Sequence, residues 1–312
     1  MICLGLDTSN YTTSAAWFDG SVGDNQGRLL EVPQGSLGLR QSDALFQHVK
    51  HLPEVFHALG AFHGIGAVGA STRPRAVEGS YMPCFLAGEG HGRVLADTLG
   101  VPFVAVSHQQ GHLAAAAWSA GRPELLDAPL LAWHLSGGTT ELLLVTPQEW
   151  NVEARRIGGT TDISAGQLID RTGVLLGLPF PAGKGVDALS LHAEGGNKGF
   201  PVRLNGLDFS LSGMENKVRQ LAEQGRPKAE IARFAVDTVA DVVCRATQAA
   251  QALYPGLPVL CSGGVASNTR LRQVLEEQGA FFAQPRYSTD NAMGVAILAH
   301  RSLVWAERGG RA

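Results

Sequence analysis

Residues 2–18 read ICLGLDTSNYTTSAAWF, and residues 130–145 read LLAWHLSGGTTELLLV. Each stretch has an apolar run, a short turn of small polar residues and a second apolar run. This pattern is typical of two strands joined by a tight turn. The turns fall at 7–13 and 136–140. A hairpin that recurs in each half of the chain predicts a duplicated nucleotide-binding α/β fold.

Helical and strand-like segments alternate along the rest of the chain. Periodic apolar spacing predicts the helices, and short apolar runs predict the strands. The segments are helices over 42–59, 163–176 and 231–253, and strands over 64–70, 101–106 and 259–261. Such alternation indicates parallel or mixed sheets with helices on their faces. In the first helix we expect Ser42 to be the N-cap, Pro53 to kink or divide the helix, and His48 and His51 to lie at the surface.

The composition supports a globular protein of this kind. The chain has 312 residues, of which 45% are apolar, 17% are charged and 39 are glycine. These values fit two domains and exclude a disordered chain or a coiled coil. The formal net charge of -3 shows no strongly basic character. We expect no membrane span or signal peptide, and cysteines that are reduced in the cytoplasm.

Two histidines directly follow the strand predicted at 101–106. Ser107 and Gln110 fit an S-x-x-Q capping box, so a helix is expected to begin there. His108 and His112 then project from the same helical face, where two imidazoles can bind one metal ion. The same spacing also occurs in histidine pairs that bind nothing. A metal site needs a third ligand from another part of the chain.

Three loops contain residues that could complete a binding site. The glycines at 136–138 would let backbone N–H groups approach a phosphate, although they also suit an ordinary hairpin turn. The loop at 262–268 precedes a helix expected from about Ser267. The N-terminus of this helix could bind an anion, or Ser267 could be its N-cap without any ligand. Asp290 is either a helix N-cap or the oxygen ligand beside the two imidazoles.

Taken in order, these motifs resemble the family of tRNA threonylcarbamoyl-adenosine synthases, which includes bacterial TsaD and was once described as O-sialoglycoprotein endopeptidases. The matching positions are His108, Gly111, His112, Ser136-Gly137-Gly138, Asp162, 166–183, Leu211-Ser212-Gly213, 263–266, Asn268 and 289–292. The resemblance implies a two-domain actin/sugar-kinase/Hsp70 fold with duplicated mixed sheets and flanking helices. We expect a first domain at 1–126 and a second at 127–298. The C-terminal helix and tail at 299–312 should return to the first domain.

The same resemblance implies the ligands. One divalent metal ion, iron or zinc, would be held by His108, His112 and Asp290. An adenine nucleotide (ATP or ADP) or threonylcarbamoyl-adenylate would bind near Ser136, Gly137 and Gly138. Further nucleotide contacts would come from Asp170, Gly183, Asp187 and Asn268. The implied partners are tRNA and a protein subunit similar to TsaB, and the catalytic residues stay unassigned.

The chain also departs from the family pattern. Gln110 stands where the family has an acid, Thr139 replaces a histidine, and Glu215 replaces a helix lysine. Residues 7–12 read DTSNYT in place of ETSCDE. The losses surround the reacting groups and the RNA-binding face, so the chain resembles a diverged paralogue.

Three functions therefore stay open at the level of sequence. The first is metal-dependent transfer of a threonylcarbamoyl group from its adenylate to a tRNA adenosine. The second is an inactive relative that binds ATP or ADP and regulates or scaffolds a partner protein. The third, a metallopeptidase, has less support because no glutamate that could act as general base lies beside the histidines.

Overall fold

The computed structural model describes residues 1–9, 11–32, 39–60, 62–194 and 199–310. It divides into two compact units. The first comprises Met1–Ala128, Thr146–Ala154 and Asp290–Ala312, and the second comprises Pro129–Val145 and Arg155–Thr289. Beyond the ranges expected for the first domain, 1–126 and 299–312, the first unit also takes in 127–128, 146–154 and 290–298. Asn10 of the first turn and residues 311–312 of the tail lie outside the described residues.

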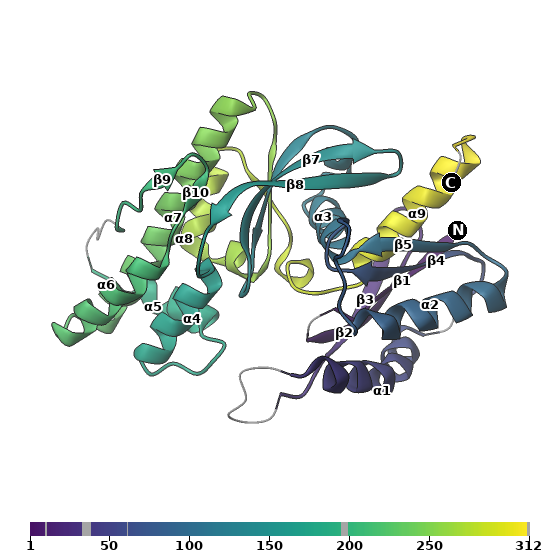
Figure 1. The fold of residues 1–312 in the computed structure, drawn as a ribbon, viewed down its shortest axis with the longest axis horizontal. Coiled ribbons are helices and arrows are strands. Elements are labelled where there is room, and N and C mark those ends of the chain that lie inside the picture. The colour runs from purple at the N-terminus through teal and green to yellow at the C-terminus, as the bar shows by residue number, and fades with distance from the viewer. Residues whose placement is uncertain (10, 33–38, 61, 195–198, 311–312) are drawn as a thin grey trace. The chain divides into compact units, whose positions relative to one another are not determined.

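The first unit contains a mixed sheet with the strand order β3-β2-β1-β4-β5. Strand β1 pairs antiparallel with β2 and parallel with β4, which in turn pairs parallel with β5. Helices α1 and α2 lie on one side of this sheet, and α3 and α9 lie on the other (Figure 1). The elements are β1 Ile2–Asp7, β2 Thr12–Phe18, β3 Gly23–Leu29, α1 Gln41–Leu59, β4 Ile65–Arg73, α2 Phe85–Leu99, β5 Phe103–Ser107, α3 His108–Ser119, a 3-10 turn Pro123–Asp127, and α9 Met293–Glu307.

Helix α1 differs from the sequence expectations at its N-cap and at His48 and His51. It begins at Gln41 with Arg40 as the capping residue, so Ser42 is not the N-cap. It continues through Pro53, which therefore does not divide it. His48 and His51 are buried, not at the surface. His48 Nδ1 lies 2.8 Å from Thr13 Oγ1 of β2, because this helical face packs on the sheet.

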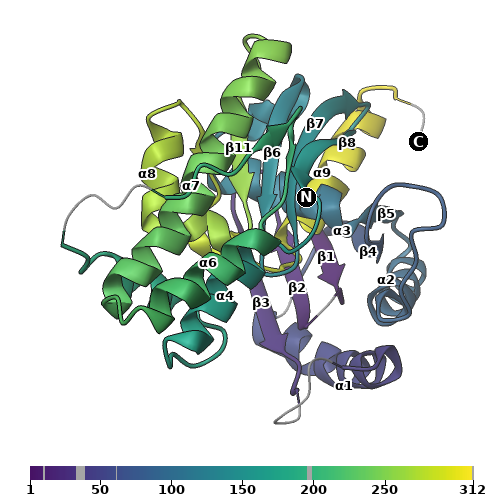
Figure 2. The same ribbon diagram turned by 60° about the vertical axis from the view of Figure 1, so that its left-hand side comes forward.

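The second unit repeats the strand pairing that opens the first. Strand β6 pairs antiparallel with β7 and parallel with β11 (Figure 2), as β1 does with β2 and β4. The predicted duplication of the hairpin is thereby confirmed. The strand order of this sheet is β12-β11-β6-β7-β8-β10-β9. The elements are β6 Leu130–Leu135, β7 Thr140–Gln148, β8 Asn151–Thr160, α4 Ala165–Leu175, α5 Gly183–Ser190, β9 Leu204–Asn205, β10 Asp208–Phe209, α6 Ser212–Glu223, α7 Lys228–Leu253, β11 Val259–Ser262, a 3-10 turn Gly264–Ser267, α8 Thr269–Glu276, β12 Phe281–Phe282, and a 3-10 turn Pro285–Tyr287. The end of β7 and the start of β8 fall within Thr146–Ala154, which belongs to the first unit.

The core of the second unit lies between its sheet and helix α7. Trp133 of β6 is completely buried, and its indole N–H donates to Thr247 Oγ1 of α7 over 2.8 Å. This bond satisfies the polar atom of a side chain whose burial contributes a large apolar area. The contact holds α7 against β6, whose last residue is followed by the loop at 136–138. Among the described residues, no helix has the length and apolar character needed to cross a bilayer.

Candidate functional site

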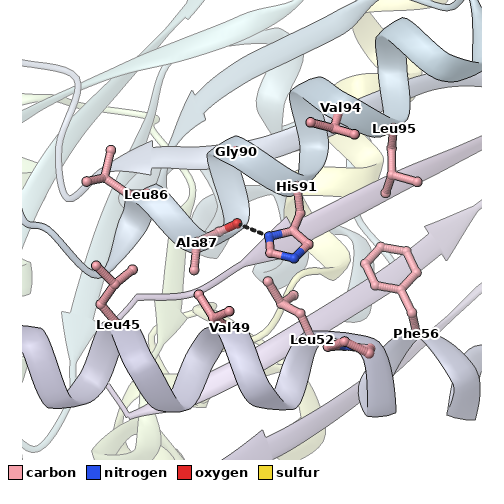
Figure 3. Close-up of a pocket in the computed structure, with 11 residues that line it drawn as sticks. Leu45, Val49, Leu52, Phe56, Leu86, Ala87, Gly90, His91, Val94 and Leu95 are labelled. Carbon is pink, nitrogen blue, oxygen red and sulfur yellow. Dashed lines mark hydrogen bonds between the residues drawn. The ribbon is translucent and has the colours of Figure 1, made fainter.

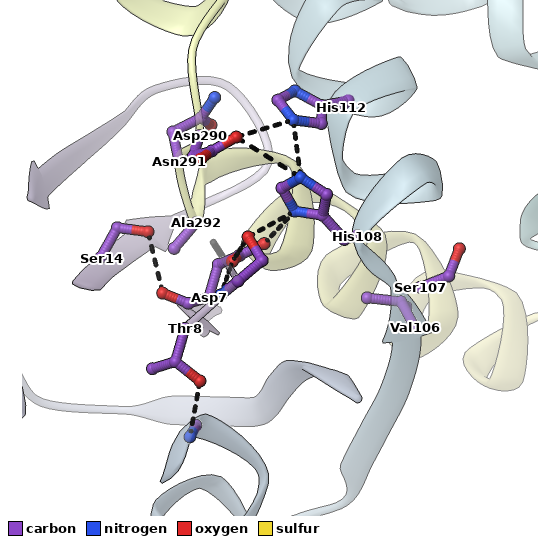
Figure 4. A network of polar contacts seen from close by, with 12 residues as sticks. Asp7, Thr8, Ser14, Val106, Ser107, His108, His112, Asp290, Asn291 and Ala292 are labelled. Atoms are coloured by element: carbon purple, nitrogen blue, oxygen red, sulfur yellow. Dashed lines mark hydrogen bonds and ion pairs between the residues drawn. The ribbon is translucent and has the colours of Figure 1, made fainter. Parts of the chain in front are cut away.

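Two histidines and an aspartate meet in the first unit (Figure 4). Helix α3 begins at His108, and the predicted capping box between Ser107 and Gln110 is confirmed. The Nε2 atoms of His108 and His112 lie 2.9 Å apart. Asp290 Oδ1 lies 3.5 Å from the first and 3.3 Å from the second. Helix α9 begins at Met293 with Ala292 as its capping residue, so Asp290 is not the N-cap.

The donor set fits a divalent metal ion. Imidazole nitrogens and a carboxylate oxygen suit zinc or iron. Ligand atoms about 2.0–2.2 Å from such an ion are themselves about 2.8–3.6 Å apart in octahedral or tetrahedral coordination. The separations among His108, His112 and Asp290 agree with this spacing. The three residues therefore form a group that could hold a metal ion.

Two glycines bring the aspartate to the histidines. Gly111 lies between the two histidines on α3, and Gly294 lies near the start of α9. A Cβ at Gly294 would be 1.7 Å from the carbonyl oxygen of Gly111, so only glycine permits this approach. On the sheet side, a Cβ at Gly5 of β1 would be 2.5 Å from the backbone nitrogen of Ala296. The ends of β1, α3 and α9 consequently converge around the metal ligands.

Asp7, which is not among the site residues predicted from the sequence, contacts the ring of His108. Asp7 Oδ2 lies 2.8 Å from His108 Nδ1, and Ser9 Oγ lies 2.8 Å from the same nitrogen. Both Asp7 and Ser9 are almost completely buried. When Nδ1 carries the proton and donates to Asp7, the Nε2 lone pair is directed to the metal site. The available signal was the position of Asp7 at the end of a buried strand, where open α/β sheets place functional groups.

The carboxylates change the pKa of the groups around the site. Burial by itself would lower the pKa of His108, but the charges of Asp7 and Asp290 and their hydrogen bonds raise it to about 10. Burial would raise the pKa of Asp290, but its contacts with both histidines hold that pKa well below its usual range. Without a metal ion, His108 therefore carries a positive charge at neutral pH, and Asp7 and Asp290 each carry a negative charge.

Gln110, which stands where the family has an acid, has a structural role. Its Oε1 accepts from the backbone N–H and the hydroxyl of Ser107, at 2.8 and 3.0 Å. Its Nε2 donates to the carbonyl oxygen of Val152 over 2.7 Å. A neutral and buried amide with these partners cannot serve as a general base. This arrangement weighs against a metallopeptidase.

In the second unit, the loop after β6 is open to an approaching ligand. Gly137 and Gly138 are exposed, and no atom lies within 4 Å of the point where a Cβ would stand on either residue. The hydroxyl of Ser164, the N-cap of α4, donates to the carbonyl oxygen of Gly137 over 2.6 Å. A Cβ on Gly166 would be 2.5 Å from the Cα of Gly137. The first residues of α4 therefore pack against the loop at 136–138 and hold it in place.

The other residues expected to contact the nucleotide lie on α4, α5 and the start of α8. Asp170 Oδ1 accepts from the backbone N–H of Ala182 at the start of α5. Asp187 accepts from Asn268 Nδ2 over 2.9 Å and from the Thr269 hydroxyl over 2.8 Å. Helix α8 begins at Thr269, and its N-cap is Asn268 and not Ser267. Asp187 and Asn268 thus bind each other.

An apolar groove runs between α1 and α2 on the first unit (Figure 3). Its volume is about 770 Å³. The lining residues are Leu45, Val49, Leu52, Pro53, Phe56, Leu86, Ala87, Gly90, His91, Val94 and Leu95. His91 turns its Nδ1 back to the carbonyl oxygen of Ala87, over 2.8 Å. Gly90 has no atom within 4 Å of the point where a Cβ would stand, so no contact within the described residues requires a glycine there.

Solved structures share the fold at low sequence identity. Component A of (R)-2-hydroxyglutaryl-CoA dehydratase from Acidaminococcus fermentans has a TM-score of 0.57 and 14% identity, over 97% of this chain and 99% of that chain. A ROK family glucokinase from Streptomyces griseus has a TM-score of 0.52 and 13% identity, over 96% of this chain and all of that chain. The protein thus has the fold of the actin/sugar-kinase/Hsp70 class.

Sequence comparison defines the family within this class. The chain is 32% identical to the tRNA N6-adenosine threonylcarbamoyltransferase of Granulibacter bethesdensis, over 94% of this chain and 86% of that protein. It is 35% identical to the enzyme of Thermus thermophilus, over 96% of this chain and 93% of that protein. Residues 79–297 match the model of the TsaD family, which is described as tRNA N6-adenosine threonylcarbamoyltransferase. The chain belongs to the TsaD family of tRNA N6-adenosine threonylcarbamoyltransferases.

Proposed function

We propose that this protein transfers a threonylcarbamoyl group from its adenylate to the N6 amine of an adenosine in tRNA. In this reaction the amine attacks the carbamoyl carbon, the bond from that carbon to the phosphate oxygen breaks, and AMP and a proton leave. Membership of the family supports the reaction class. The group of His108, His112 and Asp290, in which both histidines are buried, is the observation that carries the proposal for this chain.

Each residue around the metal centre would have a defined part. When bound, iron or zinc supplies a Lewis acid that polarises the carbamoyl oxygen or orients the phosphate. His108, His112 and Asp290 would hold the ion. Asp7 would keep the Nδ1 proton of His108 in place, so that Nε2 stays directed to the ion.

The adenine nucleotide would bind in the second unit. The backbone N–H groups of Ser136, Gly137 and Gly138 would contact phosphate, because the two glycines leave room for close approach. Of the two aspartates expected to contact the ribose, Asp170 retains Oδ2 as an acceptor without a hydrogen bond from the described residues of the second unit. Asp187 instead has both oxygens engaged by Asn268 and Thr269. We therefore assign the ribose contact to Asp170 and a supporting part to Asp187, Asn268 and Gly183.

A protein subunit similar to TsaB would be the macromolecular partner besides tRNA. The groove between α1 and α2 has the form that accepts an apolar helical face of another protein. Gly90 supports this assignment, because a glycine inside a helix costs about 1 kcal/mol relative to alanine. We place these interactions in the cytoplasm, since the four cysteines, all within the described residues, form no disulfide.

A second function is favoured by the residues that this chain has lost. Glu215 replaces a family lysine and forms ion pairs with Arg171 and Arg219, at 2.7 and 3.5 Å. These pairs reduce the positive charge that a tRNA backbone would meet at α6. Thr139 replaces a histidine beside the glycine loop. Loss of such groups with retention of the nucleotide loop suits an inactive relative that binds ATP or ADP and regulates or scaffolds a partner protein.

Metal analysis and a transfer assay separate the two functions. The purified protein and the double variant H108A/H112A are compared by elemental mass spectrometry, with His57→Ala on the exposed face of α1 as the control. We expect about one iron or zinc per chain, lost only in the double variant, and transfer of threonylcarbamoyl from its adenylate to tRNA. A folded protein that binds ADP but no metal, and transfers nothing, would exclude the transferase and support the regulator.

A further inference from the structure

Three consecutive residues at the end of β1 point alternately to two different places. Asp7 and Ser9 both contact Nδ1 of His108. Thr8, between them, turns the other way, towards the start of helix α2 (Figure 4). Asp7 and Ser9 are also bonded to each other, because the backbone N–H and the hydroxyl of Ser9 donate to Asp7 Oδ1 over 2.8 and 2.5 Å. The segment is therefore a closed turn with one side chain on its opposite face.

Thr8 bonds on both sides to the backbone of the first turn of α2. Its hydroxyl donates to the carbonyl oxygen of Cys84 over 2.9 Å and accepts from the N–H of Gly88 over 3.0 Å. Thr8 is fully buried. Helix α2 has no side-chain hydrogen bond from its own capping residue, Cys84. The Thr8 hydroxyl therefore bridges the carbonyl oxygen of Cys84 and the N–H of Gly88, the two groups that face each other across the first turn of the helix.

The contact with α2 is close as well as polar. A Cβ on Gly88 would be 3.0 Å from Thr8 Oγ1 and 3.4 Å from Thr8 Cγ2. Glycine at position 88 therefore lets the helix come near enough to hold Thr8. At Gly90, two residues further along the same helix, no described atom lies within 4 Å of the point where a Cβ would stand. Gly88 and Gly90 thus provide a matched comparison.

We propose that Thr8 is a positioning residue that anchors the segment Asp7-Thr8-Ser9 to helix α2 and thereby sets the orientation of His108. The inference rests on the metal site proposed above and adds a residue that touches none of its ligands. Displacement of the segment by a fraction of an ångström would lengthen both contacts to His108 Nδ1. The imidazole would then lose the restraint that directs Nε2 to Asp290 and His112.

The first test measures affinity for Co²⁺ by competition with a coloured chelator. Thr8→Val keeps the side-chain shape and removes both hydrogen bonds, whereas Thr8→Ser keeps them. Thr238→Val is the matched control, because this buried hydroxyl donates to Phe234 O and accepts from Phe200 N in the other unit. We expect T8V to weaken Co²⁺ binding about tenfold and to change the cobalt absorption bands, and T8S to restore both. Equal affinities in T8V and T238V would overturn the proposal.

A second pair of variants tests the same contact from the side of the helix. Gly88→Ala improves helix propensity but presses a methyl group on Thr8, while Gly90→Ala improves propensity in open space. We expect weaker Co²⁺ binding in G88A and unchanged binding in G90A. This comparison remains decisive if T8V does not fold. Equal Co²⁺ affinity in the two variants contradicts the anchor.

Failure of the proposal can be told apart from failure of the metal site. If the wild-type protein binds no Co²⁺, the metal site itself is wrong. The ¹⁵N chemical shift of His108 Nδ1 in the metal-free protein then still reports the contacts that Asp7 and Ser9 make with this nitrogen. Shifts that change in T8V and return in T8S support positioning by Thr8. Shifts that are identical in all three proteins overturn it.

Discussion

Gly294 of helix α9 lies directly against Gly111 of helix α3. A side chain on Gly294 would begin 1.7 Å from the carbonyl oxygen of Gly111. Gly111 stands between the two histidine ligands, and Gly294 follows Asp290 by four residues. The contact therefore sets how closely the carboxylate approaches the imidazoles. The glycine pair thus determines the arrangement of the three side chains that could hold a metal ion.

Gly294→Ala should disrupt both packing and metal binding. The methyl group forces α3 and α9 apart, which should lower the free energy of unfolding by about 1–3 kcal/mol. It should also move Asp290 away from His108 and His112. Chemical denaturation and elemental analysis measure the two effects. Gly90→Ala, also in a helix but with open space around it, should be neutral or stabilising. Full metal content in G294A would contradict this account.

Asp7→Asn should weaken metal binding without removing a ligand. The amide oxygen can still accept from His108 Nδ1, but the negative charge that makes the imidazole a stronger ligand is lost. Replacement of such an outer carboxylate typically costs 10–100-fold in metal affinity. A chelator competition assay measures the change. Asp97→Asn on the exposed side of α2 is the control. If D7N and D97N bind the metal equally, Asp7 does not support His108.

The sequence could predict the local parts of this site but not their meeting. Ser107, Gln110 and the histidine spacing lie within six residues, so the capping box and the shared helical face follow from helix geometry alone. Asp7 contacts His108 across 101 residues. That contact depends on the strand order β1-β4-β5 and on where α3 begins, neither of which local spacing specifies. The metal-site hypothesis from the sequence therefore included His108, His112 and Asp290 but not Asp7, which contacts His108 Nδ1.

Helix α1 shows a different limit of sequence reasoning. The amphipathic pattern of the helix predicts that His48 and His51 lie at the surface. In the structure His48 is fully buried and bonds Thr13 of β2. A hydroxyl on the facing strand makes a buried imidazole acceptable, since buried polar groups need a partner. Only the tertiary structure identifies that partner.

The metal-free protein should lose stability as the pH rises. His108 has a folded pKa of about 10, raised from 6.5 by Asp7 and Asp290 against the effect of burial. Because the pKa is raised on folding, the interaction of protonated His108 with Asp7 and Asp290 stabilises the fold fully below pH 6.5. This stabilisation is lost as the pH rises towards 10. Urea denaturation with a chelator present, at several pH values in this range, measures the slope. His108→Gln should flatten it, and an unchanged slope in H108Q would contradict the assignment.

Asp162→Ala should destabilise the second unit. The Asp162 carboxylate accepts from the backbone N–H groups of Leu211 and Ser212 at the start of α6, at 2.8 and 3.3 Å. Hydrogen bonds from this loop outweigh burial and hold the pKa of Asp162 well below its usual range. Loss of such a cap costs about 0.5–2 kcal/mol. Thermal denaturation measures the loss. Asp208→Ala, which breaks only the exposed pair with Arg156, should have a smaller effect.

Gly138→Ala should weaken nucleotide binding while leaving the fold intact. No atom lies within 4 Å of the point where its Cβ would stand, and its backbone does not require glycine, so the variant has no steric reason to unfold. A phosphate held by the loop would meet the new methyl group, because the backbone N–H groups must approach it closely. Calorimetric titration with ADP measures the affinity, which we expect to fall by at least tenfold. Gly213→Ala is the control, because its Cβ also has open space. Equal ADP affinity in G138A and G213A would mean that the loop is only a hairpin turn.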